Sequence, residues 1–159
     1  MLAELLGPIE AGAVATALRG SRWGYAGVNA AHILGIALLF GAILPLDLRL
    51  LGFWRSVPLA PLARVLVPVS TAGVVLAVAA GALLFATRAG EYAGLAIFWI
   101  KMLVVLIGVA NALLVRSALR RALAAGVDAV VPTRIRAAAI VSLAAWPAAI
   151  LCGRLIAFF

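Results

Sequence analysis

Four long runs of apolar residues decide what this chain can fold into. They cover residues 23–46, 65–87, 92–115 and 137–159, and each exceeds the ~20 residues that a helix needs to cross the hydrocarbon of a bilayer. Because lipid cannot satisfy free backbone N–H and C=O groups, each run is expected to be helical. The sequence therefore predicts an all-α, integral membrane four-helix bundle.

The composition excludes a water-soluble protein. Hydrophobic residues make up 67% of the chain and charged residues 11%, whereas a soluble domain has about 45–50% and about 25%. The mean hydropathy is +1.25. No polar stretch among the 159 residues is long enough for a second globular domain, so residues 1–159 are predicted to form a single membrane domain.

Residues 1–22 are predicted to form an amphipathic helix on the membrane surface. Apolar residues recur there at helical spacing, with two acidic residues between them: Leu2, Leu5, Leu6 and Ile9, with Glu4 and Glu10. This start lacks the basic region of a cleavable signal peptide, so the first span is expected to serve as the insertion signal. Turns are predicted over residues 51–61 and 124–132, where Gly52, Pro58, Pro61, Gly126 and Asp128 occur.

The net charge of +8 arises mostly from arginines that flank the spans. Headgroup anchoring explains these arginines without nucleic acid as a partner, and leaves the lipid bilayer as the environment. The first and third connections hold eight of them (Arg49, Arg55, Arg64, Arg116, Arg120, Arg121, Arg134 and Arg136), and the other side holds three (Arg19, Arg22 and Arg88). The positive-inside rule therefore predicts a multi-pass membrane protein with both of these connections in the cytoplasm and both termini extracytoplasmic. The inverted orientation stays open because the rule is a bias.

Ionisable side chains within the spans mark a candidate site. His32 lies eight residues after Gly24, and Lys101 lies eight after Ala93, which places both ~12 Å below the outer membrane edge. Arg154 approaches the same level from the end of the fourth span. Because no carboxylate occurs at this depth, these side chains need a partner of another kind to offset the cost of their charge.

Two interpretations of these residues stay open. In the structural one, His32 hydrogen-bonds across the bundle and Lys101 reaches headgroups or a backbone carbonyl. In the functional one, a flat ligand such as haem b binds with His32 as the axial ligand of the iron, Lys101 or Arg154 near the propionates, and Asn29 on the face of His32. With one histidine per chain, His–Lys ligation, an open position or two subunits sharing the haem would be required.

Several other classes of site lack the residues they need. A copper path would depend on Met1, Met102, Cys152 and His32, which are too few and too scattered. The single cysteine allows no intrachain disulfide. There is no Ser–His–Asp set, no Gly-rich phosphate loop and no paired carboxylates.

Other polar and small residues are predicted to hold the bundle together. Asp47, Arg49 and Asn111 are expected to form a structural polar cluster at the cytoplasmic side. Small residues at helix-packing spacing predict close helix contacts: Ser70, Gly73, Ala77 and Gly81 in span two, Gly94 and Gly108 in span three, and Ser142, Ala149 and Gly153 in span four.

Motifs over residues 18–116 carry a resemblance to a family. They resemble the motifs of an uncharacterised family of small bacterial four-helix inner-membrane proteins. The residues that carry this resemblance are Leu18–Trp23 with Tyr25, the run His32-Ile33-Leu34-Gly35, the run Asp47-Leu48-Arg49-Leu50-Leu51-Gly52, Gly81–Phe85, and Phe98–Lys101 with Asn111. The layout is more distantly similar to copper-resistance protein D and to the bacterial membrane protoporphyrinogen oxidase. The oxidase resemblance implies haem b at His32 and a second functional group at Lys101. The oxidase's further signatures are absent, so the resemblance does not extend to porphyrinogen oxidation.

The sequence thus leads to a haem-b-binding or redox-associated membrane protein as the specific hypothesis. A non-enzymatic membrane subunit or scaffold, in a homo-oligomer or a membrane complex, is the alternative. A transporter of small solutes comes third, because four short spans would have to oligomerise to line a path.

Overall fold

The structure, a computed structural model, describes residues 2–126 and 131–158, with side chains from residue 6 onward. Helices are the regular elements of its described part: α1 (Leu2–Glu10), α2 (Ala13–Gly20), α3 (Arg22–Leu51), α4 (Leu59–Thr87), α5 (Ala89–Ala93), α6 (Ala96–Ala124), α7 (Thr133–Leu155) and a closing 3-10 turn, Ile156–Phe158. The predicted all-α fold is confirmed. The predictions for Asp128 and for the side chains of Leu2, Glu4 and Leu5 lie outside what is described.

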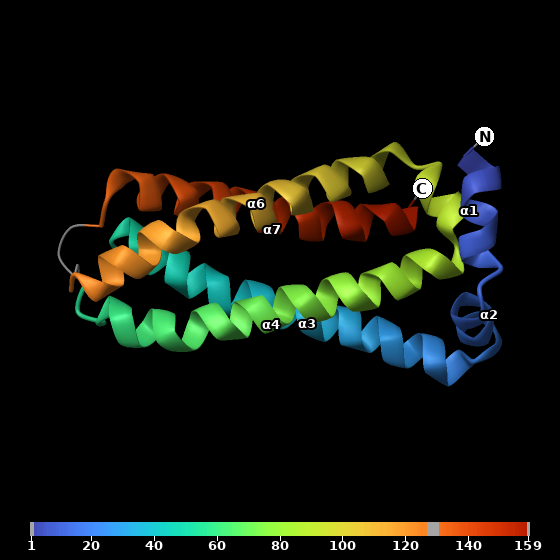
Figure 1. Cartoon of the computed structure of the whole chain (residues 1–159), viewed down its shortest axis with the longest axis horizontal. Coiled ribbons are helices and arrows are strands. Elements are labelled where there is room, and N and C mark those ends of the chain that lie inside the picture. The colour runs from blue at the N-terminus through green and yellow to red at the C-terminus, as the bar shows by residue number, and fades with distance from the viewer. Residues whose placement is uncertain (1, 127–130, 159) are drawn as a thin grey trace.

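Four of these helices, α3, α4, α6 and α7, are long and apolar enough to cross a membrane. They run alternately up and down in one bundle, and the short helices α1, α2 and α5 lie at one end of it (Figure 1). We call this the α5 end, and the opposite end the loop end. Helix α6 is the least buried of the four, which is expected of a helix that faces lipid along most of its length.

The observed boundaries correct two predictions. The third span was expected to start at residue 92, but Leu95 is extended and α6 begins at Ala96, so Tyr92 belongs to the separate helix α5. The first long helix, α3, continues to Leu51, and the second, α4, begins at Leu59, so the turn predicted over residues 51–61 is shorter than expected. Helix α3 thus continues past Asp47 and Arg49, whose side chains are buried against the rest of the bundle.

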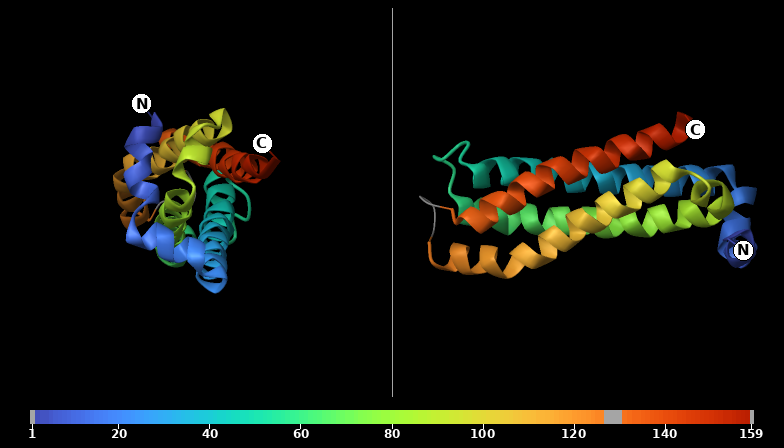
Figure 2. Two further views of the ribbon diagram at one scale, coloured as in Figure 1. Left: turned by 90° about the vertical axis from the view of Figure 1, so that its right-hand side faces the viewer. Right: turned by 90° about the horizontal axis from the view of Figure 1, so that it is seen from above.

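The N-terminal segment also differs from the prediction of one amphipathic helix over residues 1–22. It forms two helices, α1 and α2, and both lie across the α5 end of the bundle (Figure 2). Ser21 separates α2 from α3, and its hydroxyl oxygen accepts a hydrogen bond from the Gly24 N–H at 3.0 Å. This is a serine N-cap, which ends one helix and starts the next.

Arg19 fastens the N-terminal helices to the bundle. Its guanidinium donates to the Thr87 carbonyl at 3.1 Å and to the Glu10 carbonyl at 2.6 Å. The Glu10 carboxylate in turn accepts from the Gly90 N–H at 2.7 Å. These bonds join α1 and α2 to the end of α4 and to α5.

Arg19→Met should therefore release α1 and α2 without unfolding the four long helices. Losing these partly exposed hydrogen bonds should cost about 1–2 kcal/mol of local stability. Hydrogen exchange by mass spectrometry should show faster exchange over residues 13–20 and no change in α3. Equal acceleration in α3 would contradict this local role, and Arg22→Met serves as the matched control.

Helices α3 and α4 pack backbone against backbone. A Cβ added at Gly35 would lie 2.5 Å from the Ala77 nitrogen, and one added at Gly73 would lie 2.4 Å from the Leu39 nitrogen. Only glycine allows backbones to approach this closely. Helices α6 and α7 form a second pair. There, Gly108 of α6 makes room for the indole of Trp146 of α7, which would lie 3.0 Å from a Cβ at Gly108. The prediction that small residues mark helix contacts is confirmed at Gly73 and Gly108.

The two helix pairs are joined by an apolar core at the loop end. All four long helices contribute to it, through Leu46, Leu50, Leu59, Ala63, Ala122, Ile135 and Ala139. Toward the α5 end, α4 and α6 diverge (Figure 1). The bundle is thus closed at the loop end and opens toward the α5 end.

Candidate functional site

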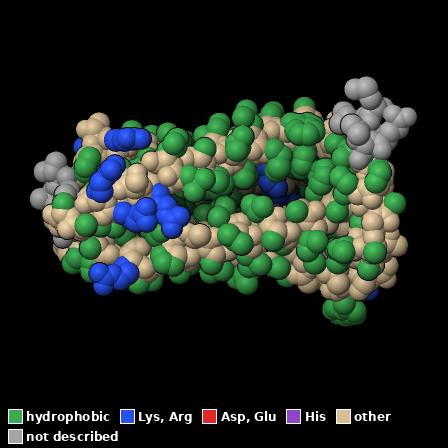
Figure 3. Space-filling view, in the orientation of Figure 1, with side chains coloured by type: hydrophobic (Ala, Val, Ile, Leu, Met, Phe, Trp, Pro, Cys, Tyr) green, Lys and Arg blue, Asp and Glu red, His purple; other side chains and the backbone are tan. Residues whose placement is uncertain are grey.

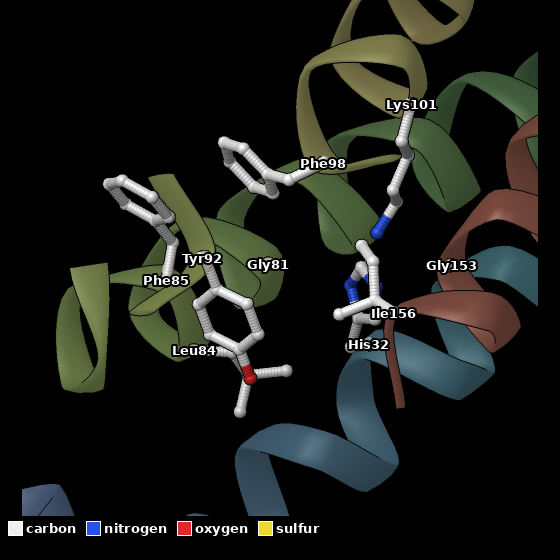
Figure 4. A pocket seen from close by; sticks show the side chains of 9 residues that line it. All are labelled: His32, Gly81, Leu84, Phe85, Tyr92, Phe98, Lys101, Gly153 and Ile156. Atoms are coloured by element: carbon white, nitrogen blue, oxygen red, sulfur yellow. The ribbon is translucent and has the colours of Figure 1, made fainter. Parts of the chain in front are cut away.

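A cavity of about 160 Å³ lies where α4 and α6 diverge. We call it the His32–Lys101 pocket. All four long helices and α5 line it, through His32, Gly81, Leu84, Phe85, Tyr92, Phe98, Lys101, Gly153 and Ile156. Figure 4 shows the Lys101 side chain descending from α6 toward the His32 imidazole on α3. The structure therefore brings together the two ionisable residues that the sequence placed at one depth.

The His32 imidazole is held in one orientation by α4. Its Nδ1 lies 2.7 Å from the Ala77 carbonyl oxygen, and because a carbonyl only accepts, Nδ1 must carry the hydrogen. In the neutral ring Nε2 then has a free lone pair. A backbone carbonyl on one nitrogen is the usual way in which a protein prepares the other nitrogen as a ligand or a base.

Gly81 provides the space for this ring. It lies one helical turn after Ala77, and a Cβ there would sit 3.0 Å from His32 Cε1 and 3.2 Å from Nδ1. Both distances are tighter than ordinary contacts. The sequence analysis placed Gly81 in a packing stripe and did not connect it with His32.

Gly81→Ala should therefore push the imidazole away from the Ala77 carbonyl. The chain has a single histidine, so ring ¹⁵N labelling gives one pair of signals in detergent micelles. The wild type should show the Nδ1–H form, and the variant a mixture of ring forms. Gly41→Ala is the matched control because a Cβ there meets nothing within 4 Å. An unchanged spectrum in Gly81→Ala would contradict this role of Gly81.

Lys101 reaches the pocket across the surface of α7. A Cβ at Gly153 would lie 3.5 Å from both Cε and Nζ of Lys101, an ordinary van der Waals contact, so the Lys101 side chain passes directly over Gly153. None of the described residues forms a hydrogen bond or ion pair with this ammonium. The described carboxylates are engaged or buried elsewhere: Glu10 with the Gly90 N–H, Glu91 with Arg88, and Asp47 toward the loop end.

Three aromatic rings, which we call the aromatic wall, bound the pocket at the α5 end. Phe98 of α6 stacks on Phe85 of α4 with centroids 5.1 Å apart and on Tyr92 of α5 at 6.1 Å. The Tyr92 hydroxyl interacts with Tyr25 of α3, and burial raises the pKa of Tyr92 above its usual value. The wall thus ties α3, α4, α5 and α6 together beyond the pocket (Figure 4).

The pocket is open on the side that faces lipid in a membrane. Figure 3 shows the surface hollowed between α4 and α6, with Lys or Arg side-chain atoms at the bottom of the hollow. Lys101 is the residue of that type in the pocket lining. The rim of the hollow is apolar, so a ligand that reaches the pocket this way must be soluble in lipid.

The other predicted cofactor residues lie away from the pocket lining. Asn29 is exposed, one turn before His32 on α3. Arg154 is exposed as well, and its guanidinium lies 5.1 Å from the ring centroid of Phe158, a cation–π contact. The structure therefore brings Lys101 to His32 but not these two side chains.

The three residues of the predicted polar cluster have different partners. The Asn111 amide donates to the Ala138 carbonyl at 2.9 Å and links α6 to α7. Arg49 is 1% exposed and donates to the Val57 carbonyl at 2.7 Å, holding the loop between α3 and α4. Asp47 is 4% exposed and hydrogen-bonds the side chain of Ser142. Ser142 was predicted only as a packing residue.

The donor atoms of the pocket suit haem b, but its size does not. Nε2 of His32 could ligate iron and Lys101 could meet a propionate. However, sites for larger organic ligands measure about 300–1,000 Å³, and this cavity has about 160 Å³. A porphyrin would enter only if the α6–α7 pair moved away from the α3–α4 pair.

The chain was compared with protein families, with curated proteins and with solved structures. No protein-family model, no curated protein and no solved structure matches the chain.

Proposed function

We propose that this chain is a multi-pass protein of the bacterial inner membrane that binds a lipid-soluble ligand in the His32–Lys101 pocket. The observation that carries the proposal is the Lys101 ammonium, which pairs with none of the described residues and lies beside an oriented imidazole in a cavity open between α4 and α6. An ammonium at membrane depth is costly without a partner. A bound ligand supplies that partner and gives the residue a function.

The proposed orientation places both termini and the pocket on the extracytoplasmic side. It rests on the eight arginines in the first and third connections against three on the other side. In this orientation the core at the loop end lies near the cytoplasm. The pocket then opens into the outer half of the bilayer.

Haem b remains a ligand to be tested, because His32 offers a nitrogen of the right kind. A bound haem would supply one-electron redox chemistry. His32 would hold the iron and Lys101 the propionates. Accommodating the macrocycle requires a wider separation of the helix pairs than the structure describes.

The competing proposal is a non-enzymatic membrane subunit or scaffold. The hydrogen bonds of His32 to α4 and of Asn111 to α7 fit such a role, because both join helices. Lys101 does not fit it, since none of the described residues pairs with its ammonium. A transporter of small solutes lacks a comparable observation.

The test is to identify what co-purifies with the chain. The protein is purified in mild detergent from haem-replete cells, its oxidised and dithionite-reduced spectra are recorded, and its organic extract is analysed by mass spectrometry. Wild type and Gly41→Ala should carry a stoichiometric ligand that His32→Phe and Lys101→Met lose. A haem spectrum would identify haem b, and an enriched organic molecule another ligand. Identical, ligand-free preparations of all four would favour the scaffold.

A further inference from the structure

The polar groups of the pocket form a donor and an acceptor that face one cavity. Lys101 has only N–H donors. His32 in its neutral form has a lone pair at Nε2, because Nδ1–H is taken by the Ala77 carbonyl. The two side chains interact electrostatically and both line the cavity. A ligand that satisfies both must accept one hydrogen bond and donate another.

A hydroxyl group does both with a single oxygen atom. It accepts from the Lys101 ammonium and donates to Nε2 of His32. A carboxylate or a ketone can accept a hydrogen bond from the ammonium. Neither has a hydrogen to donate to Nε2, so two lone pairs would face each other there. The pattern of one donor and one acceptor therefore favours a hydroxyl over either group.

The size and the lining of the cavity restrict what the rest of the ligand can be. Its volume of about 160 Å³ is below that of sites for larger organic molecules and is on the scale of a single substituted ring. Phe85, Tyr92 and Phe98 line it with aromatic surface, which suits a flat ring. The hollow between α4 and α6 opens at the surface among apolar side chains (Figure 3), so an apolar tail has a way out.

We infer that the His32–Lys101 pocket binds the ring of a lipid-soluble quinol, with one ring hydroxyl between His32 and Lys101 and the tail in the lipid between α4 and α6. This inference rests on the proposed function and names the ligand class of the same site. It concerns binding alone.

The inference predicts a preference for the reduced ligand. A quinone ring carries carbonyl oxygens, which accept from Lys101 but donate nothing to His32. The loss of one neutral hydrogen bond corresponds to an affinity about two- to tenfold lower. The quinol should therefore bind more tightly than the quinone of the same tail.

The experiment compares three probes in lipid nanodiscs that carry the full chain: decylubiquinol, decylubiquinone and decanoate. Equilibrium binding should give one saturable quinol site per chain in the wild type and in Gly41→Ala. Affinity for the quinol should fall about tenfold or more in Lys101→Met and in His32→Phe. Leu84→Trp, which fills the cavity without changing a charge, should abolish binding as well.

Each other outcome overturns a defined part of the inference. Decanoate bound more tightly than decylubiquinol, with the same dependence on Lys101, would reject the quinol and keep the proposed ligand site. Haem in the purified protein would also reject the quinol while keeping the proposed function. Equal partitioning of all three probes into wild type and variants would reject the quinol, and the co-purification experiment would then decide the proposed function separately.

Discussion

Gly73→Ala is expected to destabilise the protein by at least ~3 kcal/mol, the upper end of the usual cost of overpacking. The added Cβ would lie 2.4 Å from the Leu39 nitrogen and 2.8 Å from the Gly35 carbonyl oxygen. Backbone atoms cannot rotate away as a side chain can, so α3 and α4 must separate. Gly35→Ala should have a similar effect, since its Cβ would lie 2.5 Å from the Ala77 nitrogen.

The control is the same substitution at Gly41, on the exposed side of α3. A Cβ there meets nothing within 4 Å, and alanine favours the helix over glycine by about 1 kcal/mol. Gly41→Ala should therefore be neutral or stabilising. The measurement is unfolding by SDS in mixed micelles, followed by circular dichroism. A Gly73→Ala midpoint equal to that of Gly41→Ala would show that α3 and α4 are not packed as closely as described.

The α3–α4 contact also bears on the pocket. The hydrogen bond from His32 to the Ala77 carbonyl crosses this same helix pair, next to the position where Gly35 meets Ala77. Separating the helices would therefore release the imidazole. Gly73→Ala should weaken ligand binding without touching a residue of the pocket lining.

Much of this arrangement could be predicted from the sequence. Span length and charge located the four long helices, because a bilayer fixes the length of an apolar run. Counting residues from the expected span ends placed His32 and Lys101 at one level, and both do line one pocket, although α6 begins three residues later than the residue from which Lys101 was counted. Both inferences depend on position along a helix axis.

Rotation about the helix axes could not be predicted. A helix surrounded by lipid is apolar on all sides, so hydrophobic periodicity does not show which face meets a neighbour. The sequence therefore missed the space that Gly81 provides for His32, the bond of Ser142 to Asp47, and the bond of Asn111 to the Ala138 carbonyl. The separate helix α5 was missed because Tyr92 and Ala93 are apolar enough to extend the third run.

Lys101→Met is expected to stabilise the ligand-free protein while removing its ligand binding. Methionine keeps most of the length of lysine and fills the same path beside Gly153. It removes a charge whose cost in a membrane helix reaches about 2.5–3.5 kcal/mol at the centre. Because Nζ lines a cavity that opens sideways, the expected gain is smaller, about 1–2 kcal/mol.

The sign of this change separates the two proposed functions. A lysine that holds the bundle together would make Lys101→Met less stable, as a scaffold role requires. A lysine that serves a ligand is a cost in the empty protein, and its removal raises the SDS midpoint while abolishing the affinity for the ligand. Proteins often carry such destabilising groups where function needs them. A lower midpoint for Lys101→Met than for the conservative variant Lys101→Arg would assign the residue to structure and leave the pocket without its ligand.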